Sequence, residues 1–155
     1  MRARQVRDIK QEGGGSGLFA RDASRRLQAY LDQQFPPPVR YLIALAVKDK
    51  ASGGALLLWK PLPPTPDFVA LGMVATSQPP EAKEPRPPPF DAVRCVPKAW
   101  ARKAAAPEVV WQGSAGTVWR TRHNLLVGAK GRQPPPMYEL PRDSFSSETP
   151  NPPAV

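Results

Sequence analysis

The chain has 155 residues, of which 22 are proline and 11 are glycine, and it carries a formal net charge of +9. Because proline fits poorly inside helices and central strands, this composition predicts an ordered core of roughly 80–90 residues. One cysteine and one histidine exclude an intramolecular disulfide and a zinc site built from four nitrogen and sulfur ligands.

The N-terminal segment, residues 1–20, is basic and glycine-rich, and we expect it to be a disordered tail. It lacks the apolar core of a secretory signal, and Asp8 and Glu12 argue against an organelle transit peptide without excluding one. No apolar run approaches about 18 residues, so we expect no transmembrane span. Together with the single cysteine, these features favour a cytoplasmic location.

Residues 21–38 are expected to hold one short helix and a proline linker. Asp22 or Ser24 is placed to cap the helix, which must end before the prolines at 36–38. Its apolar residues recur at helical spacing on one face: Leu27, Tyr30, Leu31 and Phe35. This short face either packs on the rest of the fold, which we favour, or binds a membrane surface or a partner.

Residues 39–145 are expected to form an all-β module of the β-prism or β-sandwich type. Apolar runs at 39–47 and 55–59 flank a turn rich in serine and glycine, which predicts a hairpin, although the first run is also compatible with a buried helical turn. After a proline-rich segment without regular structure, residues 67–76 predict a strand kinked or bulged at Gly72.

The second half of this module begins with a surface loop at 77–89, followed by a strand at 90–96 that buries Cys95 on its apolar face. Residues 101–107 predict a loop or a short helix. Four further short strands are expected: Val109–Trp111, Thr117–Arg120, Leu125–Ala129 and Met137–Leu140. Gly113–Gly116 predicts a hairpin turn, and the proline-rich residues 146–155 predict a disordered tail.

Two segments of this module have the same order of features. Trp59–Lys60 precedes the apolar run 68–72, and Trp119–Arg120 precedes the apolar run 125–128; each run contains a glycine and is followed by prolines. A tryptophan at a strand end can cover a core, while the glycine permits close backbone approach. The pattern predicts two related strand units.

The first unit resembles a known signature. W-K-P-L-P-P at 59–64 and D-F-V-A-L-G-M-V at 67–74 resemble the pattern W-R-P-x-P-P-G-Y-x-x-L-G-x-V. This pattern occurs in the vacuolar protein sorting thirteen family of bridge-like lipid-transfer proteins and in the related sixty-two-type proteins. Further similar segments follow in order at 93–96, 110–116, 118–120 and 135–140. Asp67–Phe68 replaces the usual Gly-Tyr.

The resemblance extends over residues 59–140 and implies an accessory β module rather than the family's long lipid groove. In the large family members such modules are associated with recruitment to organelle membranes. The contacting positions lie outside the matched motif, so the resemblance assigns no individual ligand-binding residue.

The residues that carry chemistry are few. His123 lies in a polar connector and is read as a solvated loop side chain, since no G-x-S-x-G elbow accompanies Ser114 or Glu108. Cys95 is read as a small buried hydrophobe. Neither glycine-rich segment ends like a phosphate loop. We therefore expect no catalytic, cofactor-binding or metal-binding residue, and no enzyme.

The tryptophans and prolines have two interpretations each. Trp59, Trp100, Trp111 and Trp119 are expected in the core rather than on a nucleic-acid-stacking surface. The proline clusters are expected to be stiff connectors, with Arg86–Pro89 the best alternative candidate for a polyproline ligand. A working surface is expected in the loops around Arg86 and Arg132.

These observations favour a non-enzymatic recruitment module of the vacuolar-sorting and lipid-transfer type, with a protein partner or an anionic membrane surface as its target. Such a module would be cytoplasmic, with peripheral attachment to organelle membranes. The alternative is a basic structural subunit of a large assembly, such as an organellar ribonucleoprotein. Nucleic acid is the less favoured partner, because basic residues form no like-charged block.

Overall fold

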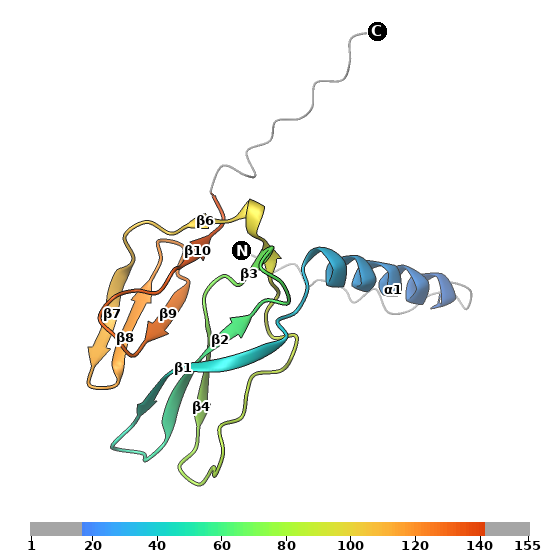
Figure 1. The fold of residues 1–155 in the computed structure, drawn as a ribbon. Helices are drawn as coiled ribbons and strands as arrows, with labels where there is room; N and C mark the ends of the chain where they lie inside the picture. Colours follow the sequence, from blue (N-terminus) through green and yellow to red (C-terminus); the bar gives the residue numbers. More distant parts are fainter. Residues whose placement is uncertain (1–16, 142–155) are drawn as a thin grey trace, which may run out of the picture. The chain divides into compact units, whose positions relative to one another are not determined.

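The structure is a computed structural model that describes residues 17–141, and the chain divides into two compact units, Met1–Gln33 and Gln34–Val155 (Figure 1). The predicted class, all-β with one short N-terminal helix, is confirmed. The predicted C-terminal tail, the boundary at residue 145 and the first 16 residues of the N-terminal tail lie outside the described residues.

The helix α1 spans Gly17–Gln34 and ends before the prolines, as predicted. It begins earlier than expected, because every residue after the glycine-rich run tolerates helical backbone. The predicted tail boundary at residue 20 is therefore wrong, and Asp22 lies inside the helix instead of capping it. There it forms an ion pair with Arg26 at 3.0 Å, one turn further on. Leu27 and Tyr30 are more than half exposed, and packing of their face on the β module stays a prediction.

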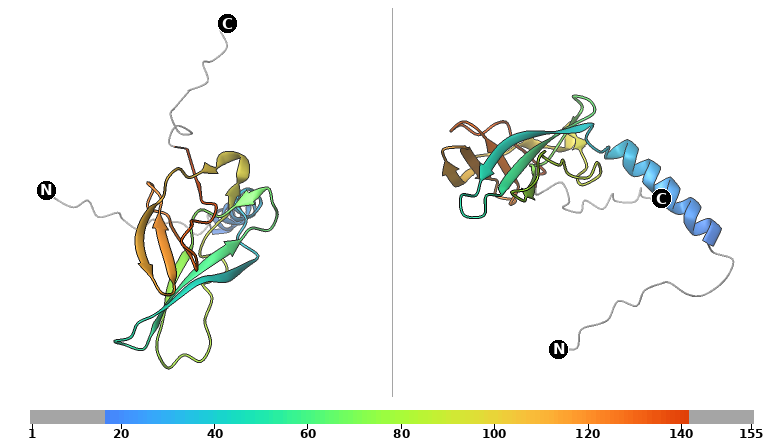
Figure 2. Two further views of the ribbon diagram at one scale, coloured as in Figure 1. Left: turned by 60° about the vertical axis from the view of Figure 1, so that its left-hand side comes forward. Right: turned by 90° about the horizontal axis from the view of Figure 1, so that it is seen from below.

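The second unit contains two three-stranded antiparallel sheets, and Figure 2 shows them from two further sides. The first sheet has the order β1–β2–β4, with β1 Arg40–Lys48, β2 Ala55–Leu62 and β4 Val74–Gln78. The second has the order β7–β8–β9, with β7 Glu108–Gly113, β8 Gly116–Arg120 and β9 Leu126–Ala129. The predicted hairpins, including the turn between Gly113 and Gly116, are confirmed.

Two short strand pairs and one turn of 3₁₀ helix complete the module. Strand β3, Phe68–Val69, pairs with β5, Val96–Pro97, and β6, Arg102–Lys103, pairs with β10, Tyr138–Glu139. The 3₁₀ helix η1 spans Lys98–Trp100. These pairs join segments far apart in the sequence.

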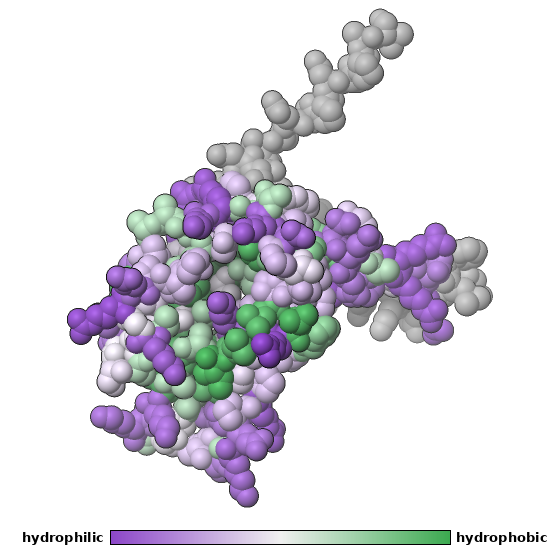
Figure 3. All heavy atoms as spheres, viewed as in Figure 1, coloured by the Kyte–Doolittle hydropathy of each residue, from purple (hydrophilic) through white to green (hydrophobic). Residues whose placement is uncertain are grey.

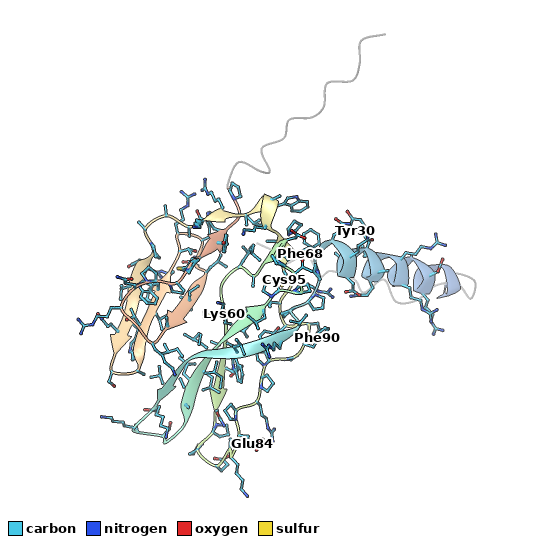
Figure 4. The ribbon with its side chains drawn as sticks, in the orientation of Figure 1. Tyr30, Lys60, Phe68, Glu84, Phe90 and Cys95 are labelled. Carbon is cyan, nitrogen blue, oxygen red and sulfur yellow. The ribbon has the colours of Figure 1, made fainter. Side chains whose placement is uncertain are left out.

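Two expected strands differ from the structure. Residues 67–76 do not form one strand: β3 and β4 belong to different sheets, because Gly72 adopts a φ of 78° and turns the chain between them. The strand expected at 90–96 is reduced to the pairing of Val96, because the segment before it lies beside no other strand of the described chain. Phe90 is consequently 63% exposed (Figure 4).

The proline-rich segment after Trp59 was expected to hold no regular structure, yet β2 continues through Pro61 to Leu62. Pairing of β2 with β4 stops at Trp59, whereas pairing with β1 continues, with Pro61 opposite Tyr41. Proline is tolerated there because its missing N–H would face the side on which β2 has no neighbour.

The two sheets share a plan centred on the tryptophans of the predicted repeat. Trp59 lies on the central strand β2 opposite Ile43, and Trp119 lies on the central strand β8 opposite Val109. In both sheets the register of the first strand shifts directly after that opposing residue, which is the mark of a β-bulge.

The third strands of the two sheets, β4 and β9, also correspond, although the sequence repeat had matched β9 with the run at 68–72. Val74 of β4 pairs with Trp59, as Val127 of β9 pairs with Trp119. The strand that matches β9 is therefore β4, and not the run at 68–72. The sequence repeat identified the two tryptophans correctly and aligned the third strand wrongly.

Side chains of the first sheet fill space that glycines leave open in the second. Leu45 and Leu58 are at most 3% exposed. A Cβ at Gly128 would lie 2.6 Å from Leu58 Cδ1, and one at Gly116 would lie 2.8 Å from Leu45 Cδ1. The Met73 N–H also donates to the Leu126 carbonyl at 2.9 Å, so the sheets are joined by packing and by backbone.

Candidate binding surface

The four tryptophans divide into two groups. Trp59 and Trp119 are 4% and 2% exposed, which confirms their predicted place in the core. Trp100 and Trp111 are 52% and 38% exposed, so the same prediction is wrong for them. Trp100 packs edge-on against Phe35, with ring centroids 5.5 Å apart. Trp111 lies on β7, the strand at the border of its sheet.

Every residue of β7 is exposed, although half of the strand is apolar. Val109, Val110 and Trp111 keep 51%, 42% and 38% of their surface open, and we call these three residues the β7 surface. Strand β8 lies along one side of β7, and no strand of the described residues lies along the other. The β7 surface thus combines apolar side chains with an unpaired strand edge.

Both ends of β7 are held in place. At its start Glu108 accepts a hydrogen bond from Arg120 Nη2 at 2.8 Å, across to β8. At its end the chain turns back within two residues, and the ring of Trp111 lies where a side chain at Gly113 would stand. Contacts with β8 and with the turn therefore position both ends of this edge.

A polar cavity of about 520 Å³ lies beside the tip of this hairpin. We call it the hairpin pocket; its lining residues are Gln112, Gly113, Ser114, Gly116, Thr117, Lys130, Gly131 and Arg132. Thr117 is 1% exposed, and its Oγ1 has no hydrogen-bond partner among the described residues. Arg132, whose loop was expected to contribute to a working surface, lies at this pocket.

A second, smaller cavity of about 190 Å³ brings together the segments that carry the family resemblance. The residues that line it come from both segments of the predicted repeat. Lys60, Pro61 and Gly72 belong to the first segment, and Val127 and the run 135–138 belong to the second. Lys60 is labelled on β2 in Figure 4. The matched residues of the two units therefore meet around one mostly apolar depression.

The loop around Arg86, the other expected surface, lines a cavity of about 830 Å³ against β4. Arg86 and Pro87 are exposed, but Pro88 is buried. A polyproline ligand must offer its prolines to a partner domain, so the burial of Pro88 disfavours that alternative and favours the stiff connector.

Cys95 is fully buried, as predicted, and its N–H donates to the Pro36 carbonyl at 2.8 Å (Figure 4). Burial raises the pKa of the Cys95 thiol above its ordinary value, because the apolar surroundings disfavour the thiolate. A thiol in this setting is a poor nucleophile at neutral pH.

The interpretation of His123 as a solvated side chain is wrong. Its Nε2 lies 3.7 Å from Oε2 of Glu139, a residue that is 1% exposed. Arg102 and Arg122 hold the other carboxylate oxygen at 3.3 and 3.2 Å. The sequence offers little signal for this cluster, since Glu139 stands alone in a short strand, and its partners come from β6 and from the connector after β8.

This arrangement is a buried carboxylate surrounded by cationic donors, which ties β10 to β6 and to the connector after β8. Thr121 Oγ1, the nearby hydroxyl of that connector, accepts from the N–H groups of His123 and Leu125 and so shapes the loop. No group of three metal-ligating side chains occurs within residues 17–141.

Comparisons with protein-family models, with curated proteins and with solved structures found no match. The resemblance to the vacuolar-sorting proteins therefore stays a prediction. Within the part of the chain that the structure describes, α1 lacks the apolar length that a membrane-crossing helix needs.

Proposed function

We propose that the β module is a non-enzymatic protein-recruitment module, which captures an extended segment of a partner protein along strand β7. The observation that carries this proposal is that β7 lies at the border of its sheet and has no buried residue, although half of its residues are apolar. Edge strands of this kind bind extended peptides by strand addition, in which backbone hydrogen bonds give affinity and side chains on both faces give specificity.

The side chains of the β7 surface suit a protein partner. Trp111 offers a large, rigid contact area, and tryptophan is among the residues that dominate protein interfaces. Val109 and Val110 add β-branched side chains that pack well against a neighbouring strand. With a net charge of +9, the chain favours an acidic partner segment, since complementary charge speeds encounter.

An anionic membrane is the competing target for an exposed tryptophan on a basic protein. Inserting β7 into the apolar part of a bilayer would leave the N–H and C=O groups of its free edge without partners, which costs several kcal/mol per group. An added peptide strand satisfies the same groups. The free edge therefore favours a protein, and a membrane-resident partner would still place the module at an organelle surface, as the resemblance implies.

Selection from a random peptide display library on the purified chain tests the proposal. Val110→Lys places a charge on the edge and should reduce binding of the selected peptides at least tenfold, because edge lysines oppose strand addition. Val39→Lys is the matched control, since Val39 is 58% exposed and lies directly before β1, outside the β7 hairpin. Amide hydrogen exchange should slow along β7 when the peptide is bound.

Two results would contradict strand addition. In the first, selected peptides bind Val110→Lys as tightly as the unmodified chain. In the second, the library yields no binder, while vesicles of phosphatidylcholine and phosphatidylserine float with the unmodified chain but not with Val110→Lys. The second result would assign the β7 surface to membrane binding.

A further inference from the structure

We propose that the hairpin pocket binds the phosphate group of a small polar phosphomonoester. This inference concerns a different ligand class from the strand addition proposed for β7 and does not depend on it. Three features carry it: a buried hydroxyl and two cations, none of which has a partner among residues 17–141, and a cavity of suitable size.

The buried hydroxyl belongs to Thr117, whose Oγ1 is fully enclosed and has no hydrogen-bond partner within residues 17–141. Buried polar atoms in folded proteins are almost always paired, so an orphan indicates a missing water, ion or ligand. His123 Nε2 and Glu139 Oε2 also lack hydrogen bonds, but they face each other at 3.7 Å. Thr117 has no such neighbour. It is one of the residues that line the pocket, and contact of its enclosed Oγ1 with a ligand requires rotation of the side chain.

Comparison of the two sheets shows that the Thr117 hydroxyl replaces an apolar side chain. Counting back from the two tryptophans, Thr117 takes the place in β8 that Leu57 takes in β2. Leu57 is 3% exposed, and a leucine there contributes burial of apolar area without any unpaired atom. The second sheet has a hydroxyl at the equivalent buried position, which is a choice that packing alone does not explain.

Strand register assembles the rest of the pocket around Thr117. Thr117 lies between Gln112 of β7 and Ala129 of β9, so the Gln112 side chain shares its face of the sheet. Directly after Ala129 the chain enters the turn that contains Lys130 and Arg132. Gly131 between them has open space around its Cα, so a ligand can approach the backbone.

The pocket is positive. Lys130 and Arg132 line it, no carboxylate does, and neither cation forms an ion pair with any residue in the described range. A guanidinium, an ammonium and a hydroxyl together offer charge-assisted hydrogen bonds to several oxygens of one anion, which suits phosphate better than a carboxylate.

The size of the pocket defines the rest of the ligand. A volume of about 520 Å³ falls within the range of small-molecule sites, about 300–1,000 Å³, and exceeds what a bare phosphate ion fills. The remaining lining is glycine, Gln112 and Ser114, which suits hydroxyl groups rather than an acyl chain. A phosphorylated polyol fits this chemistry, either free or as the headgroup of a lipid.

Isothermal titration calorimetry with the full chain tests the proposal, using glycerol phosphate as ligand and glycerol as its uncharged control. We expect glycerol phosphate to bind and glycerol not to bind. The double variant Lys130→Gln with Arg132→Gln should weaken binding by about a hundredfold, on the order of tenfold for each charge-assisted contact removed. Lys50→Gln with Lys103→Gln, which removes two exposed lysines elsewhere, should leave affinity unchanged.

Thr117→Val is the sharper variant, because it removes only the unpaired oxygen. It should fold as well as the unmodified chain by circular dichroism and bind glycerol phosphate roughly tenfold more weakly. Vesicles of phosphatidylcholine with a minor share of a phosphatidylinositol phosphate provide the second arm. Binding to both probes indicates a free or lipid-borne polyol phosphate, and binding to vesicles alone indicates the headgroup.

Three outcomes would overturn the proposal: neither glycerol phosphate nor the vesicles bind; the double glutamine variant binds as tightly as the unmodified chain; or Thr117→Val retains full affinity while remaining folded. If Thr117→Val does not fold, the double glutamine variant decides alone, because both of its side chains are exposed.

Discussion

The two sheets of the β module are built on one plan and used differently. Each has a tryptophan on its central strand and a bulge in its first strand, opposite that tryptophan. In the first sheet the bulged strand β1 alternates between exposed and covered residues and buries Leu45, although apolar side chains also lie open on the face that Figure 3 shows. In the second sheet the corresponding strand β7 buries nothing.

This difference teaches that the two sheets share their strand pairing and their central tryptophan, whereas their exposed side chains differ. We call the shared part the scaffold and the exposed part the surface. The central strands show the same division. Leu56, Leu57 and Leu58 precede Trp59, whereas Gly116, Thr117 and Val118 precede Trp119. The central strand of the second sheet therefore has smaller side chains before its tryptophan. Leucines of the first sheet occupy the space beside its glycines. The second sheet also has an open strand edge and a polar pocket.

The largest expected effect comes from removing the two core tryptophans. Trp59→Ala and Trp119→Ala should each lower the free energy of unfolding by about 3–5 kcal/mol, because both leave large cavities. Trp111→Ala, on the exposed strand, should lower it by less than about 1 kcal/mol. Urea unfolding followed by circular dichroism measures all three. A loss at Trp111 as large as at Trp119 would contradict the division between scaffold and surface.

The next effect concerns the glycine that admits Leu45. Gly116 has a φ of +147°, and a Cβ there would lie 2.2 Å from the Ala129 carbonyl oxygen. Gly116→Ala should lower the free energy of unfolding by about 2–4 kcal/mol, through backbone strain and overpacking. Gly131→Ala is the control and should change it by less than about 0.5 kcal/mol, since its nearest neighbour is 4.0 Å away. Equal effects would contradict the close approach of Ala129 and Leu45 to Gly116.

Two threonine substitutions compare paired and unpaired hydroxyls. Thr76 Oγ1 accepts a hydrogen bond from Trp59 Nε1 at 2.8 Å, so Thr76→Val should cost about 1–3 kcal/mol by leaving the indole N–H unpaired. Thr117→Val breaks no hydrogen bond within the described chain and should leave the free energy of unfolding unchanged or raise it. The difference between the two urea midpoints is the measurement; a larger loss for Thr117→Val would reverse the expectation.

The smallest expected effect is a pH dependence of stability, and it comes from Cys95 in the connector between the two sheets. Burial raises the pKa of the Cys95 thiol in the folded chain, so the unfolded chain ionises first, near its ordinary value of 9.0. Below that pH the contribution to stability is complete, and it is lost as pH rises through the folded pKa. Between about pH 7 and pH 10 the unmodified chain should therefore lose more stability than Cys95→Ala.

Tyr41, whose pKa is raised by burial and also by the charge of Cys95, gives a trend of the same sign in both proteins, and this trend is weaker in Cys95→Ala. Urea midpoints at the two pH values supply the measurement. Equal losses in the unmodified chain and in Cys95→Ala would show that the thiol is as ionisable in the folded state as in the unfolded one.

Local patterns predicted the strands that pair with sequence neighbours. Alternation and turn residues are sufficient for the hairpin of β1 and β2 and for the run from β7 to β9, because each partner follows within a few residues. The break at Gly72 was recognised only as a kink, since a sequence does not show that two halves of one apolar run enter different sheets. The pairs β3–β5 and β6–β10 contain two residues on each strand and carry no periodicity.

The candidate surfaces were harder to predict than the fold. The loop around Arg132 was expected to contribute, and the hairpin pocket includes it. The exposure of Trp111 and the burial of Glu139 were missed, because residue type favours the opposite in each case. Whether a strand lies at the border of a sheet depends on pairings between distant segments, which no local pattern records.

The bulge beside Val110 has a consequence for behaviour at high concentration. An open apolar edge is a template on which copies of a chain can stack into fibrils, and such stacking needs flat strands that repeat without interruption. A bulge bends its strand and increases the local twist. Open-ended aggregation through β7 is thereby discouraged, while a single flexible peptide remains able to follow the twisted edge.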